Sequence, residues 1–298
     1  MKNNYSKKAF YLVFSSFLYS GYLTAQPYID IVQAKYTNSP DAGLHSDKNI
    51  KNNYQYFQGS ATLPYIFKKD SSMIIFNPSF EYYKLKITSI TDLPDNLQSL
   101  ALSINYVKPL SKRWGITAGI IPRWNGYGSK TFAGSSFQLG GLSFASFKKN
   151  DHLEYKFGLY FNSEFSGPFF MPLAGIDWQI NKRNALFGIL PGNLTYEHQV
   201  SKKFYCGALF RAITNSYQAG FHDNTSILKY IRIDENQLGI YADAYLTNKI
   251  VFTAEAGHSV FRRLRFGEVN SKTPYYFQEK ENDNLYVSAT LSYRLRVR

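Results

Sequence analysis

The residues best placed for chemistry in this sequence are charged side chains at polar positions of alternating segments near the C-terminus. Arg294 and Arg296 belong to the last segment, while Asp243 and Glu255 belong to the two segments before it. Two carboxylates that face each other need a neighbouring cation, or one of them tends to hold a proton. The arginines are the natural cations here. The chemistry open to these residues is ion pairing, selection of charged solutes or catalysis by a carboxylate dyad.

Motifs that position a nucleophile, a catalytic metal or a phosphate are missing from the sequence. It contains no Gly-x-x-x-x-Gly-Lys, no His-Glu-x-x-His and no Gly-x-Ser-x-Gly. The five histidines include no two at metal-ligand spacing, and Cys206 is the only cysteine. His258 and Ser259 are adjacent, but adjacency does not make them a base and its nucleophile. We therefore expect neither an enzyme nor a cofactor or metal site, and a hydrolase is the weakest alternative.

Apolar and polar residues alternate along most of the chain after residue 25. In residues 285–297 one face is apolar along its whole length, and the other is polar or cationic. The same period of two occurs in residues 100–106, 155–161, 238–246 and 250–257 and is typical of β-strands. The last segment is longer than the usual soluble strand of about five or six residues. It is long enough to cross a bilayer at a tilt, which takes about 9–11 residues, so we predict transmembrane strands.

Two kinds of connection separate the alternating segments. Short basic connections lie at 68–70, 111–113, 148–151, 181–184, 201–203 and 247–249. Mostly longer connections, rich in turn formers, lie at 38–53, 87–96, 125–134, 163–167, 215–229 and 259–284. Short periplasmic turns and long outer loops are typical of transmembrane barrels. We predict an all-β fold, a transmembrane up-and-down antiparallel β-barrel of about 14 strands, or 12 if the short, ambiguous pair near 185–200 is left out.

The N-terminal residues have the features of a secretory signal. Lys2, Lys7 and Lys8 precede an apolar and aromatic stretch at 9–23, and small residues lead to Ala25. We predict a signal peptide at 1–25 and a barrel domain at 26–298, located in the cell outer membrane. The alternative is an uncleaved membrane anchor, for which the apolar stretch is short.

The basic balance of the sequence, a formal net charge of +13, does not indicate nucleic-acid binding. The basic residues are dispersed in pairs over the short turns and do not form one stripe with aromatic residues. This rim of charge has two interpretations, solvation of the turns or contact with anionic lipid headgroups or a periplasmic partner. The expected partners are membrane lipids, the barrel-assembly machinery and small solutes.

A weak family resemblance follows from the residues after the predicted cleavage site. These are Gln26-Pro27-Tyr28-Ile29-Asp30 and Tyr36-Thr37-Asn38-Ser39-Pro40, followed by the ladder of alternating segments and a last segment that contains Tyr293. Together they resemble an uncharacterised family of Gram-negative outer-membrane β-barrels with a domain of unknown function. The resemblance covers essentially all of 26–298 and implies an outer-membrane barrel without naming an activity or catalytic residues. The chain departs from many such barrels because it ends on Arg298 and not on an aromatic residue.

Barrel closure allows the charged residues to be placed relative to one another. A three-residue loop at 248–250 would set Asp243 directly opposite Glu255, because facing residues on the two segments must share parity. Closure also sets the first strand beside the last, so Asp30 points inward if Ile29 and Ile31 face lipid. We therefore predict one charged cluster in the lumen, across four adjoining strands. Its members are Asp30, Asp243, Glu255, Arg294 and Arg296.

Three interpretations of this predicted cluster are open. It is a salt-bridge network that stiffens the barrel seam, a charged constriction that filters solutes, or a catalytic dyad. The leading functional prediction is a passive pore or a solute-binding and transport barrel. The alternatives are a structural or partner-binding envelope barrel without transport and, least favoured, a barrel-embedded hydrolase, because a fold does not determine a function.

Overall fold

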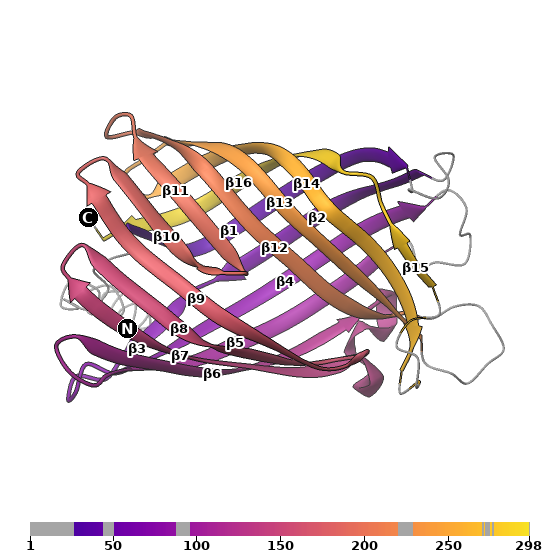
Figure 1. The fold of residues 1–298 in the computed structure, drawn as a ribbon. Helices are drawn as coiled ribbons and strands as arrows, with labels where there is room; N and C mark the ends of the chain where they lie inside the picture. Colours follow the sequence, from indigo (N-terminus) through magenta and orange to yellow (C-terminus); the bar gives the residue numbers. More distant parts are fainter. Residues whose placement is uncertain are drawn as a thin grey trace, which may run out of the picture.

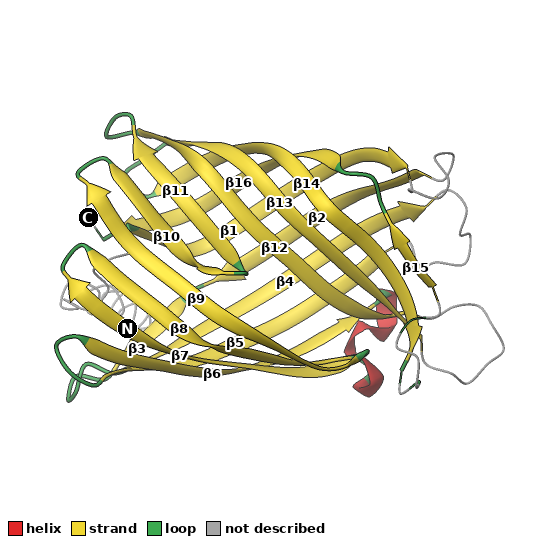
Figure 2. Ribbon diagram, viewed as in Figure 1, coloured by secondary structure: helices red, strands yellow, loops and turns green. Residues whose placement is uncertain are grey.

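The computed structural model describes residues 27–43, 51–87, 96–219, 229–269, 271, 275 and 277–297, and the signal peptide predicted at 1–25 lies outside them. Its strands are β1 (Tyr28–Gly43), β2 (Lys51–Ala61), β3 (Leu63–Ile66), β4 (Met73–Ile87), β5 (Asn96–Pro109), β6 (Trp114–Gly126), β7 (Phe137–Asn150), β8 (Leu153–Glu164), β9 (Gly167–Asn181), β10 (Asn184–Leu190), β11 (Asn193–Gln199), β12 (Phe204–Ala219), β13 (Lys229–Tyr245), β14 (Ile250–Glu268), β15 (Phe277–Lys280) and β16 (Asn284–Arg296). Two short 3-10 helices, η2 (Gly128–Phe132) and η3 (Gly134–Ser136), lie between β6 and β7 (Figure 2). Among the described residues, no helix is long and apolar enough to span a membrane.

The strands form one antiparallel meander that closes on itself (Figure 1). Each strand pairs with its neighbours in chain order, and β1 pairs with β16 to complete the ring. The short strand β3 continues along β4 after β2, and β15 pairs only with the far part of β14. The ring therefore has 14 strands, which confirms the predicted all-β, up-and-down barrel.

The alternation seen in the sequence corresponds to two faces of the wall. In β16, Leu285, Val287 and Leu291 are exposed on the outside, while Ser288 and Thr290 are buried inside. Phe170 and Ile240 are 67% and 69% exposed on the same outer surface of other strands. A continuous apolar surface of this kind marks contact with a membrane or a partner. We call it the apolar belt.

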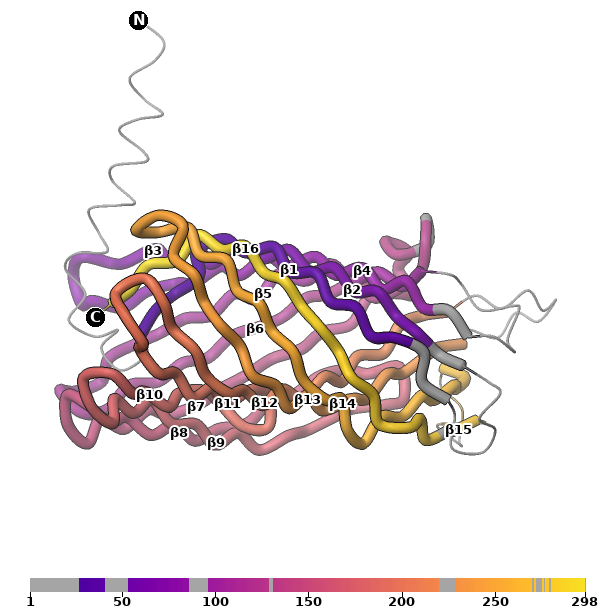
Figure 3. The backbone as a smooth tube through the Cα atoms, turned by 90° about the horizontal axis from the view of Figure 1, so that it is seen from above, coloured from indigo at the N-terminus to yellow at the C-terminus, as the bar shows by residue number. Residues whose placement is uncertain are grey.

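The two ends of the barrel differ. The turns that follow β3, β5, β7, β9, β11 and β13 and both ends of the described chain lie together at one end, which we call the turn end, as the views in Figures 1 and 3 show. The opposite end, here the loop end, carries η2, η3 and β15. Several turns at the turn end are closed by serine or threonine side chains; Ser111 and Thr247, for example, accept hydrogen bonds from backbone N–H groups two and three residues ahead.

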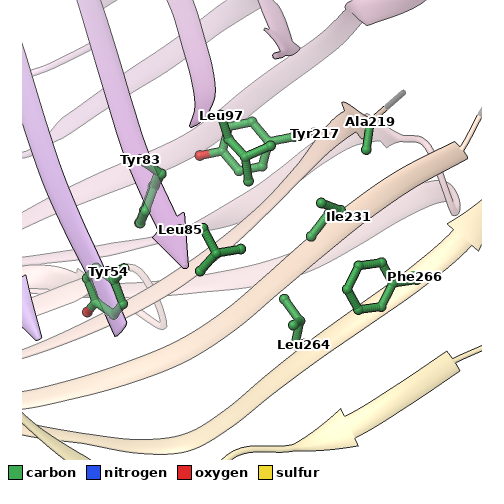
Figure 4. Packing of buried hydrophobic residues seen from close by; sticks show 9 residues of the cluster. All are labelled: Tyr54, Tyr83, Leu85, Leu97, Tyr217, Ala219, Ile231, Leu264 and Phe266. Atoms are coloured by element: carbon green, nitrogen blue, oxygen red, sulfur yellow. The ribbon is translucent and has the colours of Figure 1, made fainter. Parts of the chain in front are cut away.

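Near the loop end, β12, β13 and β14 bend into the barrel. Residues of these strands meet side chains from β2, β4 and β5 in a buried cluster across the lumen (Figure 4). The ring of Tyr83 lies 5.8 Å from that of Tyr54 and 6.0 Å from that of Tyr217, so three tyrosines connect the two sides. We call this cluster the plug, and its members are Tyr54, Tyr83, Leu85, Leu97, Tyr217, Ala219, Ile231, Leu264 and Phe266.

Candidate functional site

A chamber lies inside the barrel between the turn end and the plug. Its central cavity has a volume of about 510 Å³. A second cavity of about 340 Å³ shares Gln33 with it, and a third of about 310 Å³ shares Ile29, so the three adjoin. The third cavity also touches Lys112 and Arg113 in a turn, and the chamber therefore extends to the turn end.

The wall of the chamber carries both charged and apolar side chains. Lys35, Asp243, Glu255 and Arg294 come from β1, β13, β14 and β16, which are consecutive in the ring. Apolar lining residues come from several strands, among them Ile75 of β4, Phe144 of β7, Phe187 of β10 and Leu209 of β12. The third cavity also touches the ion pair of Lys156 and Asp177 on β8 and β9. A ligand that fits this wall would carry polar and apolar parts.

Arg294 joins three strands through two carboxylates. Its Nε and Nη2 atoms donate to the two oxygens of Asp30 at 2.6 and 3.0 Å, and its Nη1 atom donates to Asp243 at 2.5 Å. Thr253 also donates to Asp243, and the Tyr28 ring lies 3.6 Å from the guanidinium carbon. The side chains of Arg294 and Asp243 are 5% and 1% exposed. We call Asp30, Asp243 and Arg294 the seam group, because it ties β13, β16 and β1 together at the point of closure.

Glu255 lies in a second set of contacts, deeper in the chamber. It binds Lys35 Nζ at 3.2 Å and Arg211 Nη2 at 3.1 Å, and Arg211 also donates to Gln237 Oε1 at 2.6 Å. Two cations face one carboxylate, so the central group of Lys35, Arg211 and Glu255 carries a formal surplus of positive charge. The Arg211 side chain is 29% exposed to the chamber and is the most accessible of the three.

Arg296 belongs to neither of these groups. It makes a bidentate pair with Glu197 on β11 at 2.8 and 2.9 Å, and it donates to the Tyr245 hydroxyl at 2.7 Å. Its guanidinium carbon lies 3.5 Å from the centre of the Tyr205 ring. This pair joins β16 to β11 near the turn end.

The structure separates the five residues that we expected in one cluster. Asp30, Asp243 and Arg294 are together, whereas Glu255 lies in the central group and Arg296 pairs with Glu197. The expected pairing of Asp243 with Glu255 is wrong, since Asp243 is opposite Thr253 and Glu255 is opposite Tyr241. The loop between β13 and β14 has an odd number of residues, as we expected, but it begins one residue earlier. Each residue of β13 therefore faces a residue of β14 that lies two positions earlier than expected.

Sequence reasoning missed Lys35, Arg211 and Glu197. A register shift between Asp30 and Val32 changes which positions of β1 face inward, so Lys35 becomes an inward residue. Arg211 and Glu197 occupy inward positions in the alternating patterns of β12 and β11. This alternation is the sequence feature that could have identified them as residues of the lumen. Within the described part of the chain, no three His, Cys, Asp or Glu residues are grouped as metal ligands.

Three solved structures show similarity to this chain at low sequence identity. The COG4313 outer membrane channel from Pseudomonas putida F1 is 9% identical, with a TM-score of 0.44, 89% of this chain covered and 95% of that chain. A Pseudomonas aeruginosa FadL homologue is 10% identical, with a TM-score of 0.41 and 91% of each chain covered. The NanC porin is 8% identical, with a TM-score of 0.37, 88% of this chain covered and 100% of that chain.

A search of curated proteins finds no match. Residues 23–298, which include every residue that the structure describes, match the family described as a domain of unknown function, DUF6268. The chain therefore belongs to the DUF6268 family.

Proposed function

We propose that this protein is an outer-membrane transport barrel that binds a small solute in its chamber. The apolar belt supports a position in a bilayer, because an outward-facing apolar band is the surface that a transmembrane barrel presents to lipid. The short turns would then face the periplasm. Membrane lipids and the barrel-assembly machinery are the partners that this location requires.

The chamber is the observation that carries the proposal. A barrel of 14 strands is wide enough to hold a lumen unless side chains or loops fill it. Here the plug fills the lumen near the loop end, while about 510 Å³ of space lies beside the seam and central groups. Space lined by charged groups and continuous with one mouth suits a binding site better than a purely structural wall.

The plug makes a permanently open pore a poor fit to this architecture. Tyr217 is 0% exposed and packs against Tyr83 across the lumen. Passage to the loop end requires β12–β14 to move outward. The proposed transport is therefore gated and does not use a permanently open pore. The plug thus sets the direction of free access, which is from the turn end.

Conductance across planar lipid bilayers tests the proposal. Tyr217→Ala removes the central ring of the plug, and we expect its mean single-channel conductance to exceed that of the wild type. Phe170→Ala, which removes an exposed ring from the apolar belt, is the matched control and should leave conductance unchanged. A Tyr217→Ala protein that folds, as shown by heat-modifiable gel mobility, yet conducts no more than a protein-free bilayer would refute transport through the lumen.

A second candidate function is a partner-binding barrel without transport, and the plug favours it as well. The exposed lysines and arginines of the turn end, such as Lys69 and Arg113, would then contact an anionic periplasmic partner. Under this alternative, Tyr217→Ala would stay non-conducting, and neutralising Lys69 and Arg113 would reduce capture of envelope proteins.

A further inference from the structure

The central cavity of the chamber has two oppositely charged poles. The seam group contains two carboxylates and one guanidinium, a formal charge of −1, and the central group contains two cations and one carboxylate, a formal charge of +1. All six side chains line this one cavity of about 510 Å³. Among the described residues, no ion pair joins a member of one group to a member of the other. The surplus charge of each group is therefore not balanced by direct contact with the other.

The two poles lie one inward position apart on β14. Thr253, which donates a hydrogen bond to Asp243 of the seam group, precedes Glu255 of the central group by two residues. Two residues of a strand span about 7 Å. A small molecule with a positive and a negative end can therefore reach both poles at once.

Each pole presents one accessible side chain to the cavity. In the seam group it is Asp30, whose side chain is 17% exposed, against 5% or less for its two partners. In the central group it is Arg211, at 29%, against 10% or less for its two partners. An ionised carboxylate has sites for about four hydrogen bonds. Asp30 can therefore accept from an ammonium group while it keeps both of its contacts with Arg294.

Tyr241 brings a further polar group between the poles. It is the inward residue two positions before Asp243 on β13, and it pairs with Glu255 of β14. The residue lines the central cavity and is only 7% exposed, and its hydroxyl has no hydrogen-bond partner among the described residues. A buried hydroxyl normally has a partner, so a ligand in this cavity would supply the one that is lacking here.

An apolar row lies beside the two poles. Phe187, Thr195 and Leu209 are aligned across β10, β11 and β12, and all three line the central cavity. The ring of Phe187 packs edge-on against that of Tyr28 at 5.5 Å, and the Tyr28 ring covers the guanidinium of Arg294. The apolar row therefore adjoins the seam group. An apolar lining with a few placed polar groups is typical of sites for small molecules.

The balance of charge in the cavity separates the classes of ligand. Its charged lining residues are three cations and three anions, so their formal charges sum to zero. A solute with one charge would match one pole and leave the surplus of the other unmatched. A zwitterion matches both poles and brings no net charge into the cavity.

We infer that the central cavity binds a small zwitterion with an ammonium group, a carboxylate and an apolar side chain, the chemistry of a free amino acid or a short peptide. The ammonium lies at Asp30, and the carboxylate lies at Arg211 with the Tyr241 hydroxyl beside it. The apolar side chain lies against Phe187 and Leu209. This inference names the ligand class of the chamber and so rests on the proposed function.

Calorimetric titration of the purified, folded protein in detergent tests the ligand class. The probes are L-leucine, 4-methylpentanoate, which lacks the ammonium, and 3-methylbutylamine, which lacks the carboxylate. We expect leucine to bind about tenfold or more tightly than either singly charged analogue, because each analogue loses a charged hydrogen-bond partner. Equal affinity of leucine and 4-methylpentanoate, or of leucine and 3-methylbutylamine, would overturn the inference.

Leucyl-leucine and its N-acetyl derivative distinguish the two sources of this chemistry. Tighter binding of leucyl-leucine than of leucine identifies a short peptide as the ligand, and the opposite order identifies a free amino acid. In the first case acetylation of the peptide should weaken binding about tenfold or more, since it removes the ammonium. If neither leucine nor leucyl-leucine binds, the inference is wrong.

Two substitutions test the residues of the site. Arg211→Gln should weaken binding of leucine but not of 3-methylbutylamine. Tyr241→Phe removes a hydroxyl without a protein partner, so it should leave the melting temperature unchanged and weaken leucine binding about two- to tenfold. Tyr36→Phe, on the outer face of β1, is the matched control and should leave binding unchanged. Unchanged leucine affinity in either folded variant contradicts the inference, and the analogue series in the wild type decides if Arg211→Gln does not fold.

The failure of this inference is distinguishable from the failure of the proposed function. If no zwitterion binds while Tyr217→Ala conducts, the ligand class is wrong and transport through the lumen stands. If leucine binds as expected but a folded Tyr217→Ala protein does not conduct, transport fails and the ligand class stands.

Discussion

Arg294 and Asp30 face each other across the pair of strands that closes the barrel, although 264 residues separate them in the sequence. Two parallel hydrogen bonds of 2.6 and 3.0 Å join them, and the remaining amino group of Arg294 binds Asp243. Bidentate pairs of this kind add geometric specificity to their energy. One guanidinium therefore holds the first strand, the last strand and β13 in a single register.

Arg294→Met should destabilise the barrel, because it leaves Asp30 and Asp243 buried without their cation. We expect the free energy of unfolding to fall by about 3–5 kcal/mol, as for other broken buried pairs. Denaturant titration of the detergent-folded protein measures it. Arg113→Met, at an exposed turn, should change the same quantity by no more than about 0.5 kcal/mol. Equal effects of the two substitutions would show that the seam group is not structural.

Arg294→Glu distinguishes the two main interpretations of the seam group. If the group is only structural, three carboxylates now meet and thermal stability falls. If it also filters solutes, a folded Arg294→Glu protein changes its cation-to-anion preference in planar bilayers, measured in the conducting Tyr217→Ala background. A melting temperature and an ion preference that both match those of the background would argue against both roles.

Glu255→Gln should cost more than Lys35→Met, because the two substitutions leave different charges behind. Without Glu255, Lys35 and Arg211 face each other unbalanced, and we expect a loss of about 3–5 kcal/mol in the free energy of unfolding. Without Lys35, Glu255 keeps its pair with Arg211, so the loss should be about 1.5–3 kcal/mol. The same titration ranks them, and the opposite order would contradict the contacts of the central group.

Much of the wall could be predicted from the alternation of residues. The odd positions of 285–297 are apolar and face outward, and closure of a meander requires the first strand to lie beside the last. These two facts were enough to expect 14 strands and an inward Asp30 near Arg294. They are properties of local pattern and chain order, and need no knowledge of tertiary packing.

Register and strand bending could not be predicted in the same way. A shift of one position in the hairpin loop moved the partner of Asp243 from Glu255 to Thr253, and a bulge after Asp30 reversed the parity of β1. The inward bend of β12 is marked in the sequence by a change from apolar Phe210 to polar Ser216 on one face of the strand. That change indicates a bend once it is known that Gln138 and other residues distant in sequence contact this face.

Gly207 of β12 lies where any side chain would collide with the wall. A Cβ atom there would stand 1.9 Å from the carbonyl oxygen of Tyr196 and 2.8 Å from the ring of Tyr241. Since backbone must shift to relieve the first contact, Gly207→Ala should lower the free energy of unfolding by about 1–3 kcal/mol. Gly134, whose added Cβ would meet nothing within 4 Å, is the matched control, and Gly134→Ala should be near neutral. Equal stability of the two variants in denaturant titration would refute the close approach.

Ser216→Val tests whether the outward face of β12 has turned away from lipid. Ser216 is fully buried, accepts a hydrogen bond from Gln138 and donates one to Glu164. Valine would leave those polar groups without this partner, so we expect the free energy of unfolding to fall by about 1–3 kcal/mol. On a lipid-facing site the same change would be neutral or favourable, and Ala208→Val, at an exposed position lower on that face, should behave so. Denaturant titration in matched detergent compares the two. If Ser216→Val stabilised the barrel as Ala208→Val does, the outward face of β12 would meet lipid at the level of Ser216 and would not bend into the barrel.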